Sequence, residues 1–366
     1  MFCPTKKLGE ICEIYQPQTI TSNEILTKGP YKVFGANGVI GYYSKYNHED
    51  AEVLVTCRGA TCGTINISEP KSWVTGNAMV VHPKNEKILS KSFLYYTLKH
   101  SNLLKTITGT GQPQITRNSL APFQIILPPL DIQKRIVERL DKIAEAQKLN
   151  DELIQKSDEL FQSLLHKELN PAGKDWKIKK IKDITTVGNG GTPSTKNPKY
   201  WNGKNLWLTP RELSGFEDVE IFDTERKISD EGLSNSSATP LPAGTVLFTS
   251  RAPIGYVAIA GVPMSTNQGF KNFICDSEQL NNKFLYFFLR LKKKYLQSLG
   301  RGATFTEISK TIVEKVEIPL PTIEVQKQIV AKLSVVQDYK KQLLAQKSLL
   351  KELFASVLNK SMKREL

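Results

Sequence analysis

The sequence predicts an α+β fold made of two tandem copies, each a strand-rich globular domain followed by one long α-helix. Its 366 residues are more than one ordinary hydrophobic core holds. Two segments 193 positions apart resemble each other: LPPLDIQKRIVERLDKI, from Leu127, and LPTIEVQKQIVAKLSVV, from Leu320. Each opens a stretch without Gly or Pro, over 131–169 and 324–363, as a long helix requires.

The similarity between the copies extends upstream of these helix starts. VLVTCRGATCG (53–63) resembles VLFTSRAPIG (246–255), and VTGNAM (74–79) resembles MSTNQGF (264–270). FLYYTL (93–98) likewise resembles FLYFFL (284–289). Because the order is preserved throughout, we predict an internal duplication.

The globular part of each copy contains short β-rich runs, such as EVLVT, GTVLFTS and YVAIAG, between Gly, Pro and Asn residues. These runs predict a mixed, strand-rich domain. The expected boundaries are a first domain over 1–128, a central helix over 129–170, a second domain over 171–321 and a C-terminal helix over 322–366.

Each long helix has one apolar stripe and must bury it on a partner. We expect the two helices to form an antiparallel coiled coil with pseudo-two-fold symmetry, which returns the C-terminus to the first domain. The alternative is that each helix docks on its own domain. The expected contact residues are Ile132, Ile136, Leu140, Ile143, Leu153 and Leu160 in the first helix, and Val325, Ile329, Leu333, Val336, Leu343 and Leu350 in the second.

The net charge of +14 favours a polyanionic partner. Residues 1–130 carry +5, 131–170 carry −2, 171–322 carry +6 and 323–366 carry +5. A mildly basic protein without a nucleic-acid partner is the alternative. The five cysteines form no CxxC pair and the four histidines have no metal-ligand spacing, so no metal site is expected. MFCPTKKLGEICEIY lacks the apolar run of a signal peptide and no membrane span is visible, so we expect a cytoplasmic protein.

Two similar basic domains joined by helices suggest a protein that binds two inverted DNA half-sites separated by bases it does not recognise. Three motifs then resemble a known family: GGTPSTKNPKYW (190–201), TGTGQPQIT (108–116) and GRGATFTEIS (300–309). Together with the paired helix starts, they are similar to the specificity subunit of type I restriction–modification systems, with two target-recognition domains and two conserved helical regions. The family's usual Glu-Gln at the helix start is Ile132-Gln133 and Val325-Gln326 here.

The resemblance implies a non-catalytic subunit that binds a bipartite, gapped site in double-stranded DNA. It implies that the helices dock two copies of an adenine-N6 methyltransferase subunit and that a motor-endonuclease subunit can join the complex. S-adenosylmethionine, ATP and Mg²⁺ would then belong to those partners. A two-headed nucleic-acid scaffold without methyltransferase partners is the main alternative.

An enzyme is the third possible class of function, and the sequence lacks the catalytic motifs that would support it. There is no P-loop, no HExxH and no Asn/Asp-Pro-Pro-aromatic tetrapeptide of amino-methyltransferases. Asp50 followed by Glu69-Pro70-Lys71 matches a nuclease-like spacing, but the match occurs in one copy only and is expected by chance. We therefore predict no catalytic residues.

Candidate DNA contacts are polar side chains in Gly-bearing loops that recur in both copies, because Arg, Lys, Asn and Gln bind base edges and phosphates. The pairs Arg58/Arg251 and Asn77/Asn267 could equally stabilise the shared fold, and Tyr42, Tyr43, Trp201 and Trp207 are expected to pack rather than stack on bases. The predicted contacts are Arg58, Thr61, Asn77, Gln112, Gln114 and Arg117 in the first domain, and Thr192, Ser194, Lys196, Arg211, Arg251, Asn267, Lys271, Arg301, Thr304 and Lys310 in the second.

Overall fold

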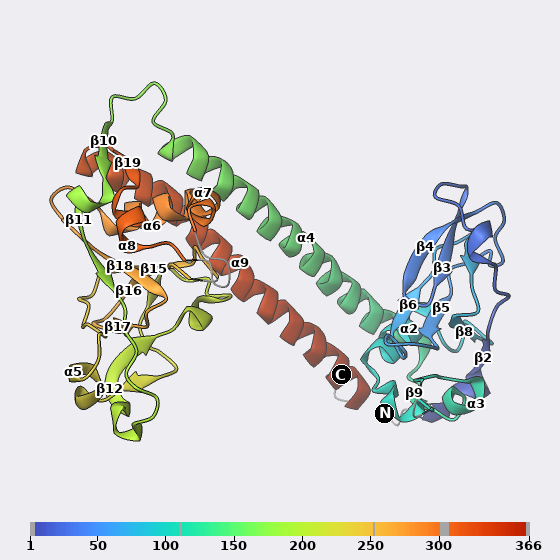
Figure 1. Cartoon of the computed structure of the whole chain (residues 1–366). Helices are drawn as coiled ribbons and strands as arrows, with labels where there is room; N and C mark the ends of the chain where they lie inside the picture. Colours follow the sequence, from blue (N-terminus) through green and yellow to red (C-terminus); the bar gives the residue numbers. More distant parts are fainter. Residues whose placement is uncertain (1–3, 110–111, 252, 301–306, 364–366) are drawn as a thin grey trace. The chain divides into compact units, whose positions relative to one another are not determined.

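The computed structural model describes residues 4–109, 112–251, 253–300 and 307–363 (Figure 1). The chain divides into two compact units, which are described separately. Unit 1 comprises Met1–Glu152 and Leu344–Leu366, and unit 2 comprises Leu153–Leu343. Each unit therefore contains one strand-rich domain and part of both long helices. No helix in the described ranges is both long and apolar enough to cross a membrane.

Unit 1 is built around the four-stranded antiparallel sheet β2-β8-β5-β6, with a three-stranded sheet β4-β3-β7 and the pair β1-β9. The central strand β5 reads VLVT and all four side chains are buried, which explains its continuous apolar run. The strands are β1 (Thr5–Lys7), β2 (Cys12–Tyr15), β3 (Tyr31–Gly35), β4 (Gly38–Tyr43), β5 (Val53–Thr56), β6 (Ile65–Ile67), β7 (Trp73–Val74), β8 (Ala78–Pro83) and β9 (Gln124–Ile126). The helices of this domain are α1 (Leu8–Ile11), η1 (Ser22–Glu24), α2 (Lys91–His100), η2 (Leu103–Thr106) and α3 (Arg117–Leu120).

Unit 2 contains the five-stranded sheet β11-β18-β15-β16-β13, a three-stranded sheet β14-β12-β17 and the pair β10-β19. Its strands are β10 (Lys177–Lys180), β11 (Thr185–Asn189), β12 (Trp201–Leu208), β13 (Glu220–Ile221), β14 (Lys227–Ile228), β15 (Val246–Thr249), β16 (Val257–Ala260), β17 (Ser265–Thr266), β18 (Phe270–Cys275) and β19 (Glu317–Leu320). Its helices are η3 (Ile181–Asp183), η4 (Pro198–Tyr200), η5 (Pro210–Leu213), α5 (Asp230–Ser234), α6 (Asn282–Leu291), α7 (Lys293–Ser298) and α8 (Lys310–Glu314).

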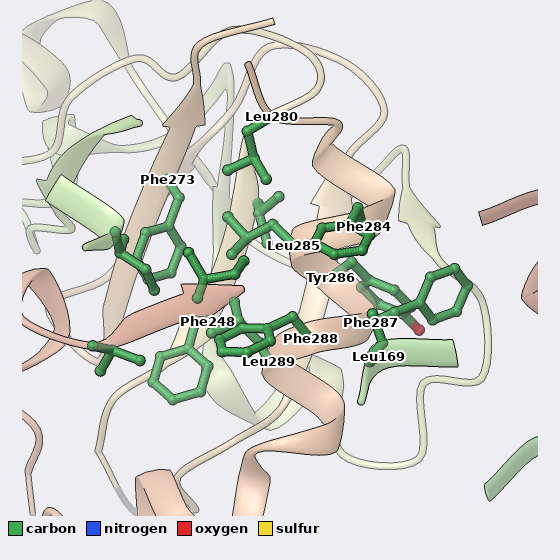
Figure 2. Packing of buried hydrophobic residues seen from close by; sticks show 14 of the residues in the cluster. Leu169, Phe248, Phe273, Leu280, Phe284, Leu285, Tyr286, Phe287, Phe288 and Leu289 are labelled. Atoms are coloured by element: carbon green, nitrogen blue, oxygen red, sulfur yellow. The ribbon is translucent and has the colours of Figure 1, made fainter. Parts of the chain in front are cut away.

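The core of unit 2 is aromatic. Phe248 from β15 and Phe273 from β18 face the α6 residues between Phe284 and Leu289, and Leu169 from a long helix reaches the same cluster (Figure 2). All of these side chains are almost fully buried. Since unit 1 packs α2 over β5 in the same way, each domain places one amphipathic helix on the face of its central strand.

The strand registers confirm the duplication. In unit 1, Val53 of β5 pairs with Val81 of β8. In unit 2, Val246 of β15, 193 positions after Val53, pairs with Phe273 of β18. The end pairs β1-β9 and β10-β19 correspond in the same way, with antiparallel strands at the start and end of each domain.

The two predicted long helices are present as α4 (Leu130–Leu169) and α9 (Ile323–Lys363). In unit 1, Leu140 near the start of α4 shares a core with Leu358 near the end of α9. In unit 2, Leu165 near the end of α4 shares a core with Leu333 near the start of α9. The helices therefore pair antiparallel, and Leu8 and Leu358, near the two chain ends, belong to one core as expected.

Ion pairs follow the same pairing. Lys347 of α9 contacts Asp151 of α4 at 2.8 Å within unit 1. Within unit 2, Lys340 contacts Asp158 at 2.9 Å, and the Lys332 ammonium lies 3.2 Å from a Glu168 carboxylate oxygen. The acidic first helix and the basic second helix are thus complementary.

Two of the predicted helix contacts are wrong. Leu153 and Leu160 are 41% and 51% exposed. After Ile143 the buried stripe of α4 keeps its three- and four-residue spacing and passes through Asn150 and Ser157 before it becomes apolar again at Phe161. Leu153 and Leu160 lie on another face of the helix. The other predicted contacts are buried or half-buried: Ile132, Ile136, Leu140 and Ile143 in α4, and Val325, Ile329, Leu333, Val336, Leu343 and Leu350 in α9.

The repeated Gln-Lys motif has a structural explanation. Gln133, in the first turn of α4, is fully buried. Its Oε1 accepts a hydrogen bond from the Ser90 N–H at 3.0 Å, and its Nε2 donates to the carbonyl oxygens of Ile88 (2.7 Å) and Pro128 (2.8 Å). One amide side chain thereby fixes the start of α4 to the loop that caps α2.

Gln326 repeats this arrangement at the start of α9. Its Oε1 accepts from the Asn281 N–H at 2.8 Å, and its Nε2 donates to the carbonyl oxygens of Gln279 (2.8 Å) and Pro321 (2.9 Å). Lys134 and Lys327, the second residues of the two motifs, are exposed. The glutamine therefore makes the junction, and the lysine faces solvent.

Candidate nucleic-acid interface

The candidate interface of unit 1 is a group of loops at the C-terminal end of β5. The Cys57 N–H donates to the carbonyl oxygen of Asn77 at 3.2 Å, and the Ile115 N–H donates to that of Cys57 at 3.0 Å. The Gly59 N–H also donates to the Pro113 carbonyl oxygen at 3.3 Å. Backbone hydrogen bonds thus join three loops that are distant in the sequence, whatever side chains they carry.

Unit 2 has the same arrangement at the end of β15. The Ser250 N–H donates to the Gly269 carbonyl oxygen at 2.7 Å, and the Ile308 N–H donates to that of Ser250 at 2.9 Å. Ser250 occupies the place of Cys57, and both are fully buried. Full burial at the same place in both copies indicates a packing role for Cys57.

In each unit one arginine faces one polar residue across these loops. Arg58 forms an isolated antiparallel bridge with Gln114, and Arg251 forms the equivalent bridge with Glu307. Side chains opposite each other in such a bridge lie on the same face. Arg251 Nε donates to Glu307 Oε2 at 2.9 Å, and the two side chains are 44% and 32% exposed. Arg58 and Gln114 are also exposed.

A third residue lies beneath this pair in unit 2. Lys271 Nζ is 3.1 Å from Glu307 Oε1, and its side chain is only 5% exposed. The prediction that Lys271 contacts DNA directly is therefore wrong, because burial directs its ammonium group to Glu307. Phe248 pairs with Lys271 where Val55 pairs with Met79, so Met79 is the equivalent residue of unit 1.

Glu307 is not among the residues predicted from the sequence, although the 193-residue offset places it on Gln114. Partial burial acts to raise the pKa of the Glu307 carboxyl. Hydrogen bonds and positive charge from Lys271 and Arg251 outweigh this and hold that pKa below its usual value. Glu307 is therefore an ionised acceptor at neutral pH.

A groove of about 830 Å³ opens beside this pair in unit 2. Its lining combines two prolines, Pro210 and Pro253, with polar and charged residues that include Arg211, Arg251, Asn267, Gln268 and Glu307. Asn267 Oδ1 accepts a hydrogen bond from the Gly269 N–H at 2.8 Å, so this side chain stabilises the turn of the loop. Asn267 was expected either to contact DNA or to stabilise the fold, and this hydrogen bond supports the stabilising role.

Two tryptophans hold the loop that carries the predicted residues Thr192, Ser194 and Lys196. Trp207 Nε1 donates to the Gly191 carbonyl oxygen at 2.8 Å, and Trp201 Nε1 donates to that of Ser194 at 3.2 Å. The guanidinium of Arg226, which the sequence analysis did not select, lies 3.9 Å from the centroid of the Trp201 ring. The two tryptophans therefore pack and position the loop, as expected, and Thr192 in this loop bonds to Gln268.

The remaining predicted residues differ in accessibility. Lys310 is half-buried and its ammonium lies 3.6 Å from the Glu314 carboxylate. Arg301 and Thr304 lie outside the described residues. The exposed members of the predicted set are Arg58, Thr61, Asn77, Gln112, Gln114 and Arg117 in unit 1, and Ser194, Lys196, Arg211 and Arg251 in unit 2.

The nuclease-like spacing does not form a metal site. Glu69 pairs with Lys32 at 2.6 Å, and Lys71 pairs with Glu49 at 3.6 Å. Within the described ranges, no three His, Cys, Asp or Glu side chains gather to hold a metal ion.

Comparison with known proteins identifies the architecture. The model of the family described as "Type I restriction modification DNA specificity domain" matches the chain twice, over 4–156 and 173–351. The chain belongs to this family. The two matched segments correspond to the two copies of the duplication, each with most of its long helix.

Individual relatives agree with this assignment. The chain is 44% identical over 167 residues to the type I restriction enzyme MjaIX specificity subunit of Methanocaldococcus jannaschii, which covers 45% of the chain and 38% of that relative. It is 25% identical over 287 residues to the putative type I restriction enzyme MjaX specificity subunit of the same organism, over 72% of the chain and 64% of the relative. The chain thus spans less than two thirds of the length of these relatives.

A solved structure shares the fold of the whole chain. The crystal structure of a type I restriction–modification S subunit from M. genitalium matches with a TM-score of 0.68. The match covers 99% of this chain and 96% of the other, at 15% sequence identity. Two strand-rich domains with two long helices are therefore common to this chain and that structure.

Proposed function

We propose that this chain is the non-catalytic DNA-specificity subunit of a type I restriction–modification complex. It binds a bipartite, gapped site in double-stranded DNA and directs adenine-N6 methylation and restriction by partner subunits. The observation that carries the proposal is the duplicated group of loops: two backbone hydrogen bonds recur at equivalent places in both units, but the residue opposite the arginine differs. A common scaffold with different side chains suits the recognition of two different half-sites.

The proposed DNA contacts are the exposed residues of these loops, with Arg58 and Arg251 at their centres. Positive charge on both domains supplies the attraction to phosphates, and side chains at the loop tips contact base edges. Asn267 and Lys271 stabilise the interface of unit 2 from below, because both side chains are bonded within the protein.

The long helices carry the proposed docking sites for two copies of the methyltransferase subunit. Leu149, Leu153 and Leu160 are all more than 40% exposed on α4, and their spacing puts them on one side of the helix. On α9, a second exposed stripe contains Val335, Tyr339, Leu349 and Leu353. One exposed stripe on each long helix gives two candidate sites. S-adenosylmethionine, ATP and Mg²⁺ belong to the partner subunits in this proposal, and the complex works in the cytoplasm.

The test is long-read detection of N6-methyladenine in the source genome, with the gene intact, deleted and restored. We expect deletion to remove methylation from one gapped, two-part motif and restoration to return it. Co-purification should give two methyltransferase chains for each copy of this chain. If the methylome does not change in cells that express the chain, the proposal is wrong and a nucleic-acid scaffold becomes the better explanation.

A further inference from the structure

We propose that Gln114 and Glu307 are equivalent base-recognising positions that make the two half-sites different. In the second domain, Arg251 and Glu307 act together to recognise a C·G base pair through the major groove. In the first domain, Gln114 recognises the adenine of an A·T pair at the corresponding position. This inference rests on the proposed function and specifies its chemistry.

The geometry of the Arg251–Glu307 pair suits a C·G pair. Arg251 uses Nε for Glu307, which leaves its two terminal NH₂ groups to donate to O6 and N7 of guanine. Glu307 is ionised and only accepts hydrogen bonds, as contact with the N4 amino group of cytosine requires. Each of its oxygens already accepts one bond, from Lys271 and from Arg251, and each has a further lone pair.

The first domain offers a different pattern at the same place. Gln114 has both a donor and an acceptor, and this combination matches N7 and N6 of adenine. Met79 takes the place of Lys271, so the buried ammonium and the carboxylate are replaced together by neutral groups. The two sets of three residues therefore carry the same net charge of +1. Their attraction to phosphate is equal, and they differ in the hydrogen bonds that they can offer.

The buried lysine determines how the exchange must be made. A carboxylate beside an arginine is mobile unless it is held, and Lys271 holds Glu307 from the buried side. Removing Glu307 alone would leave a buried ammonium without its partner, which is strongly destabilising. The informative variant is thus the double exchange Lys271→Met with Glu307→Gln, which gives the second domain the residue types of the first.

The experiment uses the full chain co-expressed with its methyltransferase subunits, and the methylated motif is read by long-read sequencing. We expect the double exchange to change the required base at one position of one half-site, with discrimination for C·G falling by about 5- to 150-fold. The other half-site and the spacer should not change. Gln114→Glu lies at an exposed position beside Arg58 and does not disturb a core. Because Met79 cannot hold the new carboxylate as Lys271 holds Glu307, this variant should weaken the preference of the other half-site for A·T without creating a full preference for C·G.

A control makes the same two exchanges at the opposite end of β15, in an ion pair whose lysine is more exposed than Lys271. Lys283 and Glu220 lie 2.9 Å apart, and the neighbouring Asn282 bonds to Gly244 before the strand begins. Lys283→Met with Glu220→Gln should leave the motif unchanged. If the parent motif is present and neither exchange alters it, Glu307 only positions Arg251 and the inference is wrong. A parent complex without any gapped motif would contradict the proposed function itself, and the inference with it.

Discussion

The buried glutamine at the start of each long helix gives the sharpest stability prediction. Gln133→Met keeps a side chain of similar length but removes an acceptor and two donated hydrogen bonds. The Ser90 N–H and the carbonyl oxygens of Ile88 and Pro128 then lose their partner. Pro128 is buried, whereas Ser90 is half-buried and Ile88 is exposed, so water can replace part of what Gln133 provides. An unsatisfied buried group costs about 1–3 kcal/mol, and we expect a loss of that size from the free energy of unfolding of unit 1.

The assay is urea unfolding combined with hydrogen exchange of the Ser90 amide, whose N–H donates directly to Gln133. Protection of this amide should fall in the variant. Lys134→Met is the matched control, because Lys134 is exposed and adjacent, and it should change stability by less than about 0.5 kcal/mol. The reasoning would be refuted if the two variants were equally stable, or if Ser90 stayed protected without Gln133.

Three further predictions follow from the same contacts. Leu153→Glu with Leu160→Glu should reduce the amount of co-purifying methyltransferase at least several-fold and leave thermal stability unchanged, because both leucines are exposed; a loss of stability would mean that they pack internally. A circular permutant opened at Pro171, with the natural ends joined, should fold and bind DNA, since residues near both ends share one core; failure to fold would contradict the antiparallel helix pair. Burial lowers the pKa of His48 below its usual value, against the opposing charge of Glu52. Unit 1 should therefore lose stability as the pH falls below about 6.5, because protonation of His48 is less favourable in the folded state. Urea unfolding at pH 7 and pH 5.5 should show this loss, and His48→Gln should reduce it.

The long helices, the buried strand and the duplication could be predicted because each produces a recognisable pattern in the sequence. The long helices follow from stretches without Gly or Pro that carry an apolar period, and the buried strand β5 follows from its run of three apolar residues and a threonine. The duplication follows from self-similarity alone. The helix and strand signals depend on residues close together in the chain, and the duplication depends on comparing the two halves of the sequence. Neither kind of signal requires knowledge of which residues touch in the folded protein.

The identity of the buried helix face depended on the tertiary structure. Leu153 and Leu160 continue an apolar pattern by eye, but the helix contact runs through Asn150 and Ser157. A fixed geometric period decides which side chains meet the partner helix, and polar residues can occupy that period when the partner offers them contacts. The sequence shows which residues are apolar but not which face of a two-stripe helix meets the other helix.

The composition of the candidate interface also required the structure. Arg251 and Glu307 are 56 positions apart, and only the backbone bridge between their loops brings them together. Lys271 was predicted as an exposed contact, and its burial became visible only with the register of β15 and β18. The sequence by itself determined that the protein has two similar basic domains and two long helices. Tertiary structure decided which charges meet, because the energy of a charge depends on its burial and its neighbours, and the chain order does not specify either.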